Sequence, residues 1–242
     1  MKNITKAVIV SAIYTAVMAL GWVFNPHDYG TIDNVLYMIP FLFVLAIFAC
    51  ILLRRAEVEL LPKHSKFARL LIPFAFILGY LLLVNILSYT DGTILGPVEK
   101  IGLLFLATML VGIAEEGVYR GYVFAAIEKQ SGTNKALLYS SVLFGLLHSV
   151  NFLAGPSIPA TIVQVVLTTL IGYVFGVIYL KTNRNLVLLM TLHGLYDFLV
   201  FSASYLAEIN NSNRNTLFVM PMLLILWIMS LRANKKEKQL ND

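Results

Sequence analysis

The sequence predicts an all-α polytopic membrane protein of about eight transmembrane helices around a buried polar cavity. Of its 242 residues, 59% are hydrophobic and 13% are charged, and the mean hydropathy is +0.80. Soluble domains average nearer 25% charged residues, so this composition excludes an ordinary soluble fold. The net charge of +5 follows the topology rather than a nucleic-acid surface, and we expect no nucleic-acid partner. Residues 1–242 are expected to form one integral membrane domain.

Eight apolar segments are candidates for spans, separated by polar loops. The first is long enough to cross a membrane and lacks the small-residue cleavage site of a signal peptide. The fifth is short, which is adequate if its end enters a cavity. In chain order the predicted spans are Ala7–Phe24, Val35–Leu53, Leu70–Leu87, Val98–Gln130, Ala136–Val150, Ala160–Leu180, Asn185–Leu206 and Thr216–Leu231.

The distribution of Lys and Arg predicts the orientation. Of the 18 basic residues, Lys100 and Arg214 fall in odd-numbered loops and Arg120 within a span, which leaves 15 on the side of the termini. The positive-inside rule makes that side cytoplasmic. We therefore expect a multi-pass protein of the cell membrane with both termini in the cytoplasm, including a basic tail at residues 232–242.

The fourth span contains the sequence AEEGVYR, with three ionisable residues inside an apolar segment. Each charge at the bilayer centre costs on the order of 2.5–3.5 kcal/mol, so Glu115, Glu116 and Arg120 indicate a functional site. A purely structural ion cluster is the alternative. Residues four apart face each other on a helix, so Glu116 is expected to pair with Arg120 and Glu115 to lie beside Tyr119. This pairing leaves Glu115 directed elsewhere.

Two further spans carry histidine at membrane depth. Phe144 and His148 are four residues apart in the fifth span, and His193 and Asp197 are four apart in the seventh. A rise of about 1.5 Å per residue allows the motifs to meet between the mid-plane and the cytoplasmic half. A carboxylate can act there as a general base, and histidines can share its proton, donate to an oxyanion or bind a metal. The residues therefore predict a shared site that activates water.

The motifs EExxxR, FxxxH and HxxxN/D, in this order and in separate spans, resemble the CPBP family. This family includes the CAAX prenyl proteases of the Rce1 type and the bacterial Abi proteins linked to bacteriocin immunity. The resemblance covers residues 98–206 as a catalytic core. It implies an intramembrane endopeptidase that cleaves a membrane-associated protein or peptide near the cytoplasmic side of the lipid bilayer.

The sequence is also compatible with two other classes of function. A non-proteolytic membrane protein of the same fold could give bacteriocin immunity or bind a partner. A proton-coupled transporter would explain the buried ionisable residues but not the ordered motifs, and the sequence shows no clear inverted repeat.

The resemblance also implies a role for each motif residue. Glu115 would activate the water together with His148, while His193 and Asp197 would stabilise the tetrahedral oxyanion. The residues expected to support the site are Glu116, Tyr119, Arg120 and Phe144.

Asp197 departs from the CAAX-protease branch, which has Asn at this position. An amide can donate to an oxyanion, whereas an ionised carboxylate only accepts, so Asp197 is expected to orient His193 or to support a metal. The family has been described both as metalloproteases and as metal-free glutamate proteases. We favour a site without metal or other cofactor. The alternative is Zn²⁺ held by Glu115, His148 and His193, which would leave the site without a base.

Overall fold

The computed structural model describes residues 2–90, 99–206 and 226–232, and every regular element in these parts is helical. The elements are α1 (Asn3–Phe24), α2 (Ile32–Tyr37), α3 (Ile39–Arg55), α4 (Leu71–Thr90), α5 (Glu99–Glu116), η1 (Gly117–Val123), α6 (Phe124–Ser131), α7 (Thr133–Leu147), η2 (His148–Ala154), α8 (Ile158–Lys181) and α9 (Leu186–Leu206). Residues 226–232 form a further helical segment. The predicted all-α class is confirmed.

Several helices could cross a membrane. Within the described parts, five are long and apolar enough, namely Asn3–Phe24, Glu99–Ser131, Thr133–Ala154, Ile158–Lys181 and Leu186–Ala203. A shorter apolar stretch at Leu71–Leu87 lies where the third span was predicted. The predicted eighth span falls mostly outside the described residues. The polytopic character is therefore confirmed, and the count of eight stays a prediction.

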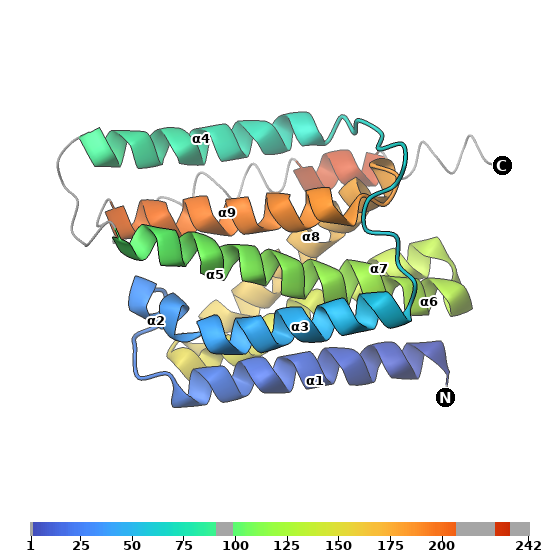
Figure 1. Cartoon of the computed structure of the whole chain (residues 1–242), viewed down its shortest axis with the longest axis horizontal. Helices are drawn as coiled ribbons and strands as arrows, with labels where there is room; N and C mark the ends of the chain where they lie inside the picture. Colours follow the sequence, from blue (N-terminus) through green and yellow to red (C-terminus); the bar gives the residue numbers. More distant parts are fainter. Residues whose placement is uncertain (1, 91–98, 207–225, 233–242) are drawn as a thin grey trace.

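Helix α5 lies at the centre of the bundle (Figure 1). It packs against α9 on one side and α3 on the other, while α7 and α8 pack against each other beside it. Helix α4 lies outside α9, and α1 contacts η1, α6 and α7. This arrangement places the three predicted motifs, on α5, at the end of α7 and on α9, around the interior of one bundle.

Two glycines set the separation of α5 and α9. A Cβ atom on Gly112 would overlap the Met190 carbonyl oxygen, and one on Gly194 would lie 2.9 Å from the Thr108 carbonyl oxygen. Small residues at such positions let two helix backbones approach closely in a membrane. The carboxylates that follow Gly112 and the histidine that precedes Gly194 are therefore brought side by side.

The second predicted span, Val35–Leu53, is divided in the structure. Helix α2 ends at Tyr37, and α3 begins at Ile39 after Met38. Pro40 lies in the first turn of α3, where its missing N–H has no helical partner to lose. The apolar pattern alone did not reveal this break.

The fourth span is one continuous helical segment from Glu99 to Ser131, but its middle turn is irregular. Residues Gly117–Val123 form a π-helix directly after the two glutamates. π-Helical turns inside α-helices are frequent at functional sites. Gly121 faces Leu53 so closely that a Cβ atom there would overlap the leucine side chain, which lets α3 pack against this turn.

The fifth predicted span, Ala136–Val150, is an α-helix of the predicted length that lies three residues earlier in the chain. Helix α7 starts after Gly132, whose φ of 80° favours glycine, and ends at Leu147. The chain then tightens into the 3₁₀ segment η2, which ends at Gly155 with a φ of 117°. His148 is therefore the first residue of η2 and not a residue within α7.

Candidate active site

Glu116 and Arg120 form the expected ion pair in the centre of the bundle. Both side chains are fully buried, and Arg120 Nη1 donates to Glu116 Oε1 at 2.9 Å. Arg120 Nη2 donates to the Gly172 carbonyl oxygen at 2.9 Å, and the guanidinium carbon lies 4.2 Å from the centre of the Phe144 ring. The charge of Arg120 is thus balanced by hydrogen bonds and an aromatic face, as a buried charge requires.

His193 lies between carboxylates on both sides of its ring. Its Nδ1 is 2.8 Å from Glu116 Oε1, the same oxygen that accepts from Arg120. Because a carboxylate oxygen accepts, Nδ1 carries the hydrogen of this bond. Local spacing does not predict this contact, since Glu116 and His193 are 77 positions apart and belong to different motifs.

Asp197 lies at the other nitrogen of the same ring. His193 Nε2 is 3.4 Å from Asp197 Oδ2 and 3.9 Å from Glu115 Oε2. The contact of Asp197 with His193 agrees with the orienting role expected from the sequence, and Glu116 adds a shorter contact at the other nitrogen. Asp197 also adds negative charge at the nitrogen that faces Glu115.

His148 is held by the backbone of the preceding turn. Its Nδ1 lies 3.0 Å from the Phe144 carbonyl oxygen, and the two rings are 5.3 Å apart between centroids. A carbonyl oxygen can only accept, so Nδ1 is the N–H of His148. In the neutral ring Nε2 is then an acceptor. Phe144 therefore supports the site twice, by fixing the tautomer of His148 and by covering Arg120.

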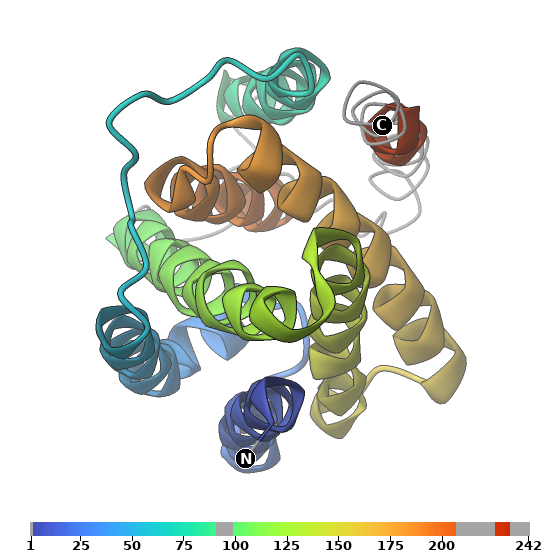
Figure 2. The same cartoon turned by 90° about the vertical axis from the view of Figure 1, so that its right-hand side faces the viewer.

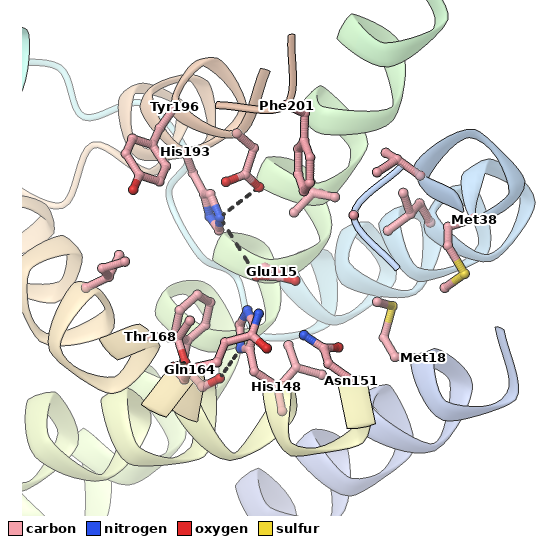
Figure 3. A pocket seen from close by; sticks show the side chains of 18 of the residues that line it. Met18, Met38, Glu115, His148, Asn151, Gln164, Thr168, His193, Tyr196 and Phe201 are labelled. Carbon is pink, nitrogen blue, oxygen red and sulfur yellow. Dashed lines mark hydrogen bonds and ion pairs between the residues drawn. The ribbon is translucent and has the colours of Figure 1, made fainter. Parts of the chain in front are cut away.

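Glu115, His148, His193 and Asp197 all line one cavity of about 220 Å³. Figure 3 shows Glu115 between His193 and His148, which come from different helices. Glu115 Oε2 is buried and has no hydrogen-bond partner among the described residues. Buried polar atoms are nearly always hydrogen-bonded, so this oxygen is available to a water or a substrate in the cavity.

Tyr119 contacts α1 and Phe144. Its hydroxyl lies 3.1 Å from the Ser11 hydroxyl, and its ring packs edge-on against Phe144 at 5.4 Å. It does not line the cavity described above. Tyr119 therefore supports the site from behind by tying α1 to the motif helix.

The sequence did not identify the polar residues that complete the cavity wall. Tyr29 comes from the loop between α1 and α2, Asn151 from η2 and Gln164 from α8. The Tyr29 hydroxyl accepts from Asn151 Nδ2 at 3.0 Å and from Gln164 Nε2 at 2.9 Å. Isolated polar residues of this kind carry no recognisable motif, although Gln164 is a polar residue in an otherwise apolar stretch. The opposite wall is apolar and includes Met18, Val35, Met38 and Leu42.

The cavity begins near the middle of the bundle. Glu115 is the seventeenth of the 33 residues of the helical segment Glu99–Ser131, and so lies at its midpoint. From there the cavity extends toward the loop at Tyr29 and Gly30, which is the end of the bundle opposite the N-terminus. The helical segment ends at Ser131, one residue beyond the predicted end of the fourth span at Gln130.

The residues proposed to hold zinc are not arranged as a ligand set. Within the described residues, no group of three or more His, Cys, Asp or Glu side chains is placed to bind a metal ion. Glu115, His148 and His193 share a cavity, and His148 and His193 each direct Nδ1 to a protein oxygen, which leaves Nε2 as the nitrogen that could bind a metal. As placed, the three side chains do not form a ligand set, and the mechanism proposed for this site uses no metal.

Comparisons with known proteins agree with the motifs. Residues 97–199 match the family described as Type II CAAX prenyl endopeptidase Rce1-like. A protein of Bacillus subtilis (strain 168) described as "Putative membrane peptidase YdiL" is 29% identical over 98 residues, which are 40% of this chain and 36% of the relative. The chain thus matches little more than a third of that relative's length, and no solved structure matches significantly. Because the matched residues 97–199 contain all three motifs, they confirm the predicted resemblance to the Rce1-like family.

Proposed function

We propose that this chain is an intramembrane endopeptidase in which Glu115 activates a water molecule for attack on a peptide bond. The Rce1-like match and the peptidase relative support a membrane protease in general. The observation that carries the mechanism is the unpartnered oxygen of Glu115, buried in a cavity beside two histidines. A membrane-associated protein or peptide is the expected substrate class.

In the first step the Glu115 carboxylate takes a proton from water as the water oxygen bonds to the peptide carbonyl carbon. The carbonyl π electrons move to its oxygen, which becomes the oxyanion of a tetrahedral intermediate. Nε2 of His148 is the acceptor nitrogen of that ring, and it orients the same water by accepting its other hydrogen. Glu115 and His148 then act on one water molecule.

In the second step the intermediate collapses and the C–N bond breaks. The proton held by Glu115 passes to the leaving amine nitrogen, which restores the carboxylate for the next turnover. His193 donates from Nε2 to the oxyanion, since its Nδ1 hydrogen is already engaged with Glu116. Asp197 and Glu116, on opposite sides of the ring, stabilise the positively charged imidazolium that this donation requires.

The direct test is cleavage by the purified protein in liposomes. A library of peptides should give products with one defined new terminus, identified by mass spectrometry. The Glu115→Gln variant, prepared in the same way, should give none of them. A wild-type protein that binds a peptide or a membrane partner without cleaving any library member would favour the partner-binding alternative.

The shared water makes a prediction about His148. If Glu115 and His148 act on one water, replacing either should lower the cleavage rate about as much as replacing both, because residues that act as a unit are not additive. We expect His148→Ala, Glu115→Gln and the double variant to have similar rates. His64→Ala, in an exposed segment far along the chain from the motifs, is the control and should retain wild-type activity. Additive losses would show that His148 is only a packing residue bonded to a carbonyl.

The Asp197→Asn variant and treatment with a chelator together test whether the reaction proceeds without a metal. Asp197→Asn removes one of the negative charges beside His193, and we expect the cleavage rate to fall about tenfold, or about 1.4 kcal/mol. Activity of the wild type should persist after treatment with a strong chelator. Loss of activity on chelation that is restored by added zinc would contradict this mechanism and would make Glu115 a ligand. An unchanged or improved rate in Asp197→Asn would instead indicate that residue 197 donates directly to the oxyanion.

A further inference from the structure

One end of the bundle gathers the basic residues of the chain. The backbone N–H of Ile4 donates to Gln130 at 3.1 Å, and Arg184 binds Glu128 at 2.7 Å, so the start of α1, the end of α6 and the α8–α9 connection meet there. This end faces the viewer in Figure 2. The segments that reach it carry Lys or Arg, among them Lys6, Arg54, Lys66, Lys129, Lys181 and Arg184.

The opposite end of the bundle has few basic residues and exposes acidic ones. In the described part of the chain its basic residue is Lys100, which forms an ion pair with Asp33 at 2.6 Å. Asp28 and Glu99 are exposed at the same end. An excess of Lys and Arg marks the cytoplasmic side of a membrane protein, while Asp and Glu contribute little to orientation. The two ends of the bundle therefore face different sides of the membrane, with the basic end in the cytoplasm.

The cavity reaches the surface at the end of the bundle that has few basic residues. Among its lining residues, all of which are described, Gly30 is the one that is exposed. Gly30 lies in the α1–α2 loop, residues 25–31, next to Tyr29. The Tyr29 hydroxyl accepts hydrogen bonds from η2 and α8, through Asn151 and Gln164, so the loop is tethered across the opening.

We propose that substrate enters this cavity from the non-cytoplasmic side of the membrane, past the α1–α2 loop, and that Tyr29 holds the loop in its closed position. The class of substrate is then a segment of a membrane-associated or exported polypeptide that is presented at the outer face. That this segment is cleaved after it enters rests on the proposed function. The direction of access does not, because it concerns where water and solutes reach the cavity.

Cysteine labelling in intact cells tests the direction of access. Cys50 is the single cysteine, so Cys50→Ser gives a background without thiols. Thr168→Cys places a thiol in the cavity wall on α8, and Val166→Cys places one on the same helix at a lipid-exposed position. Asp28→Cys and Lys66→Cys mark the exposed surfaces of the two ends.

A membrane-impermeant maleimide should label Asp28→Cys and Thr168→Cys in intact cells. Lys66→Cys should react only after permeabilisation, and Val166→Cys should react in neither case because the thiolate does not form in lipid. Labelling of Thr168→Cys only after permeabilisation would place the entrance in the cytoplasm and overturn the proposal. Absence of labelling at Thr168→Cys in both conditions would also overturn it. Neither result depends on cleavage, so a failure of access is distinguishable from a failure of the proteolytic mechanism.

The tether makes a rate prediction in the same background. Tyr29→Phe removes the acceptor for two hydrogen bonds while keeping the ring, and the labelling rate of Thr168→Cys should rise roughly fivefold or more. Tyr139→Phe, at a lipid-exposed position of α7, is the matched control and should leave the rate unchanged. Equal labelling rates with and without the Tyr29 hydroxyl would show that it does not hold the loop closed.

Discussion

Glu115→Gln is expected to lower the rate of peptide cleavage by about a hundred- to ten-thousandfold, the usual contribution of a positioned general base. Glutamine has nearly the same shape as glutamate but cannot take a proton from water. Glu115 makes no hydrogen bond through Oε2 to the described residues, so the substitution breaks no such bond to the protein at that atom. The variant should therefore insert and unfold like the wild type.

The loss is measured as initial rates on one defined substrate at equal amounts of folded protein. Glu59→Gln, at an exposed position between α3 and α4, makes the same chemical change outside the cavity and should retain full activity. A Glu115→Gln protein that turns over at nearly the wild-type rate would show that the base is another group. If Glu115→Gln fails to fold, Glu115→Asp is measured in its place. This variant keeps the carboxylate but withdraws it from the substrate.

Glu116→Gln is expected to reduce both stability and activity, because one oxygen of Glu116 serves two partners. Breaking a buried ion pair typically costs about 3–5 kcal/mol, since the remaining charge has no counter-charge. Arg120 would be left in this state, with the Gly172 carbonyl oxygen as its remaining hydrogen-bond acceptor among the contacts described above. His193 would also lose the carboxylate that fixes its Nδ1. The expected results are a lower midpoint of thermal unfolding and a cleavage rate near that of Glu115→Gln.

A second substitution separates the two effects of Glu116. Replacing a whole buried ion pair by apolar groups is often neutral for stability, so Glu116→Leu combined with Arg120→Met should recover much of the lost midpoint. The cleavage rate should not recover, because His193 still lacks its partner at Nδ1. If both properties return together, the contact between Glu116 and His193 has no part in the reaction. If Glu116→Gln leaves the midpoint unchanged, the pair does not stabilise the fold.

Features set by local spacing could be predicted from the sequence. The pairing of Glu116 with Arg120 follows from four residues of helix, and the apolar runs place most of the helices within a few residues of their ends. The proximity of His148 and Phe144 likewise follows from four positions, although the backbone there is 3₁₀. Spacing within one helix needs no knowledge of how the helices pack.

Features that depend on packing between helices could not be predicted. The contact of Glu116 with His193 arises because Gly112 and Gly194 allow α5 and α9 to approach, and no pattern in either segment encodes their relative rotation. The participation of Tyr29 in the cavity wall was also missed, since a polar loop reads as ordinary connecting chain.

The crossing of α5 and α9 through Gly112 and Gly194 has a consequence for how the reacting groups are held. Contacts between backbones contain no rotamers that could change when a substrate arrives, so the separation of the two backbones that carry Glu115 and His193 is fixed by main chain. Electrostatic stabilisation of a transition state is strongest when the donating groups do not have to reorganise. The entropy needed to order this half of the site is therefore lost once, on folding, and not again at each turnover. Because these two backbones are held rigidly, the motion required for substrate exchange takes place in parts of the molecule that are held less tightly.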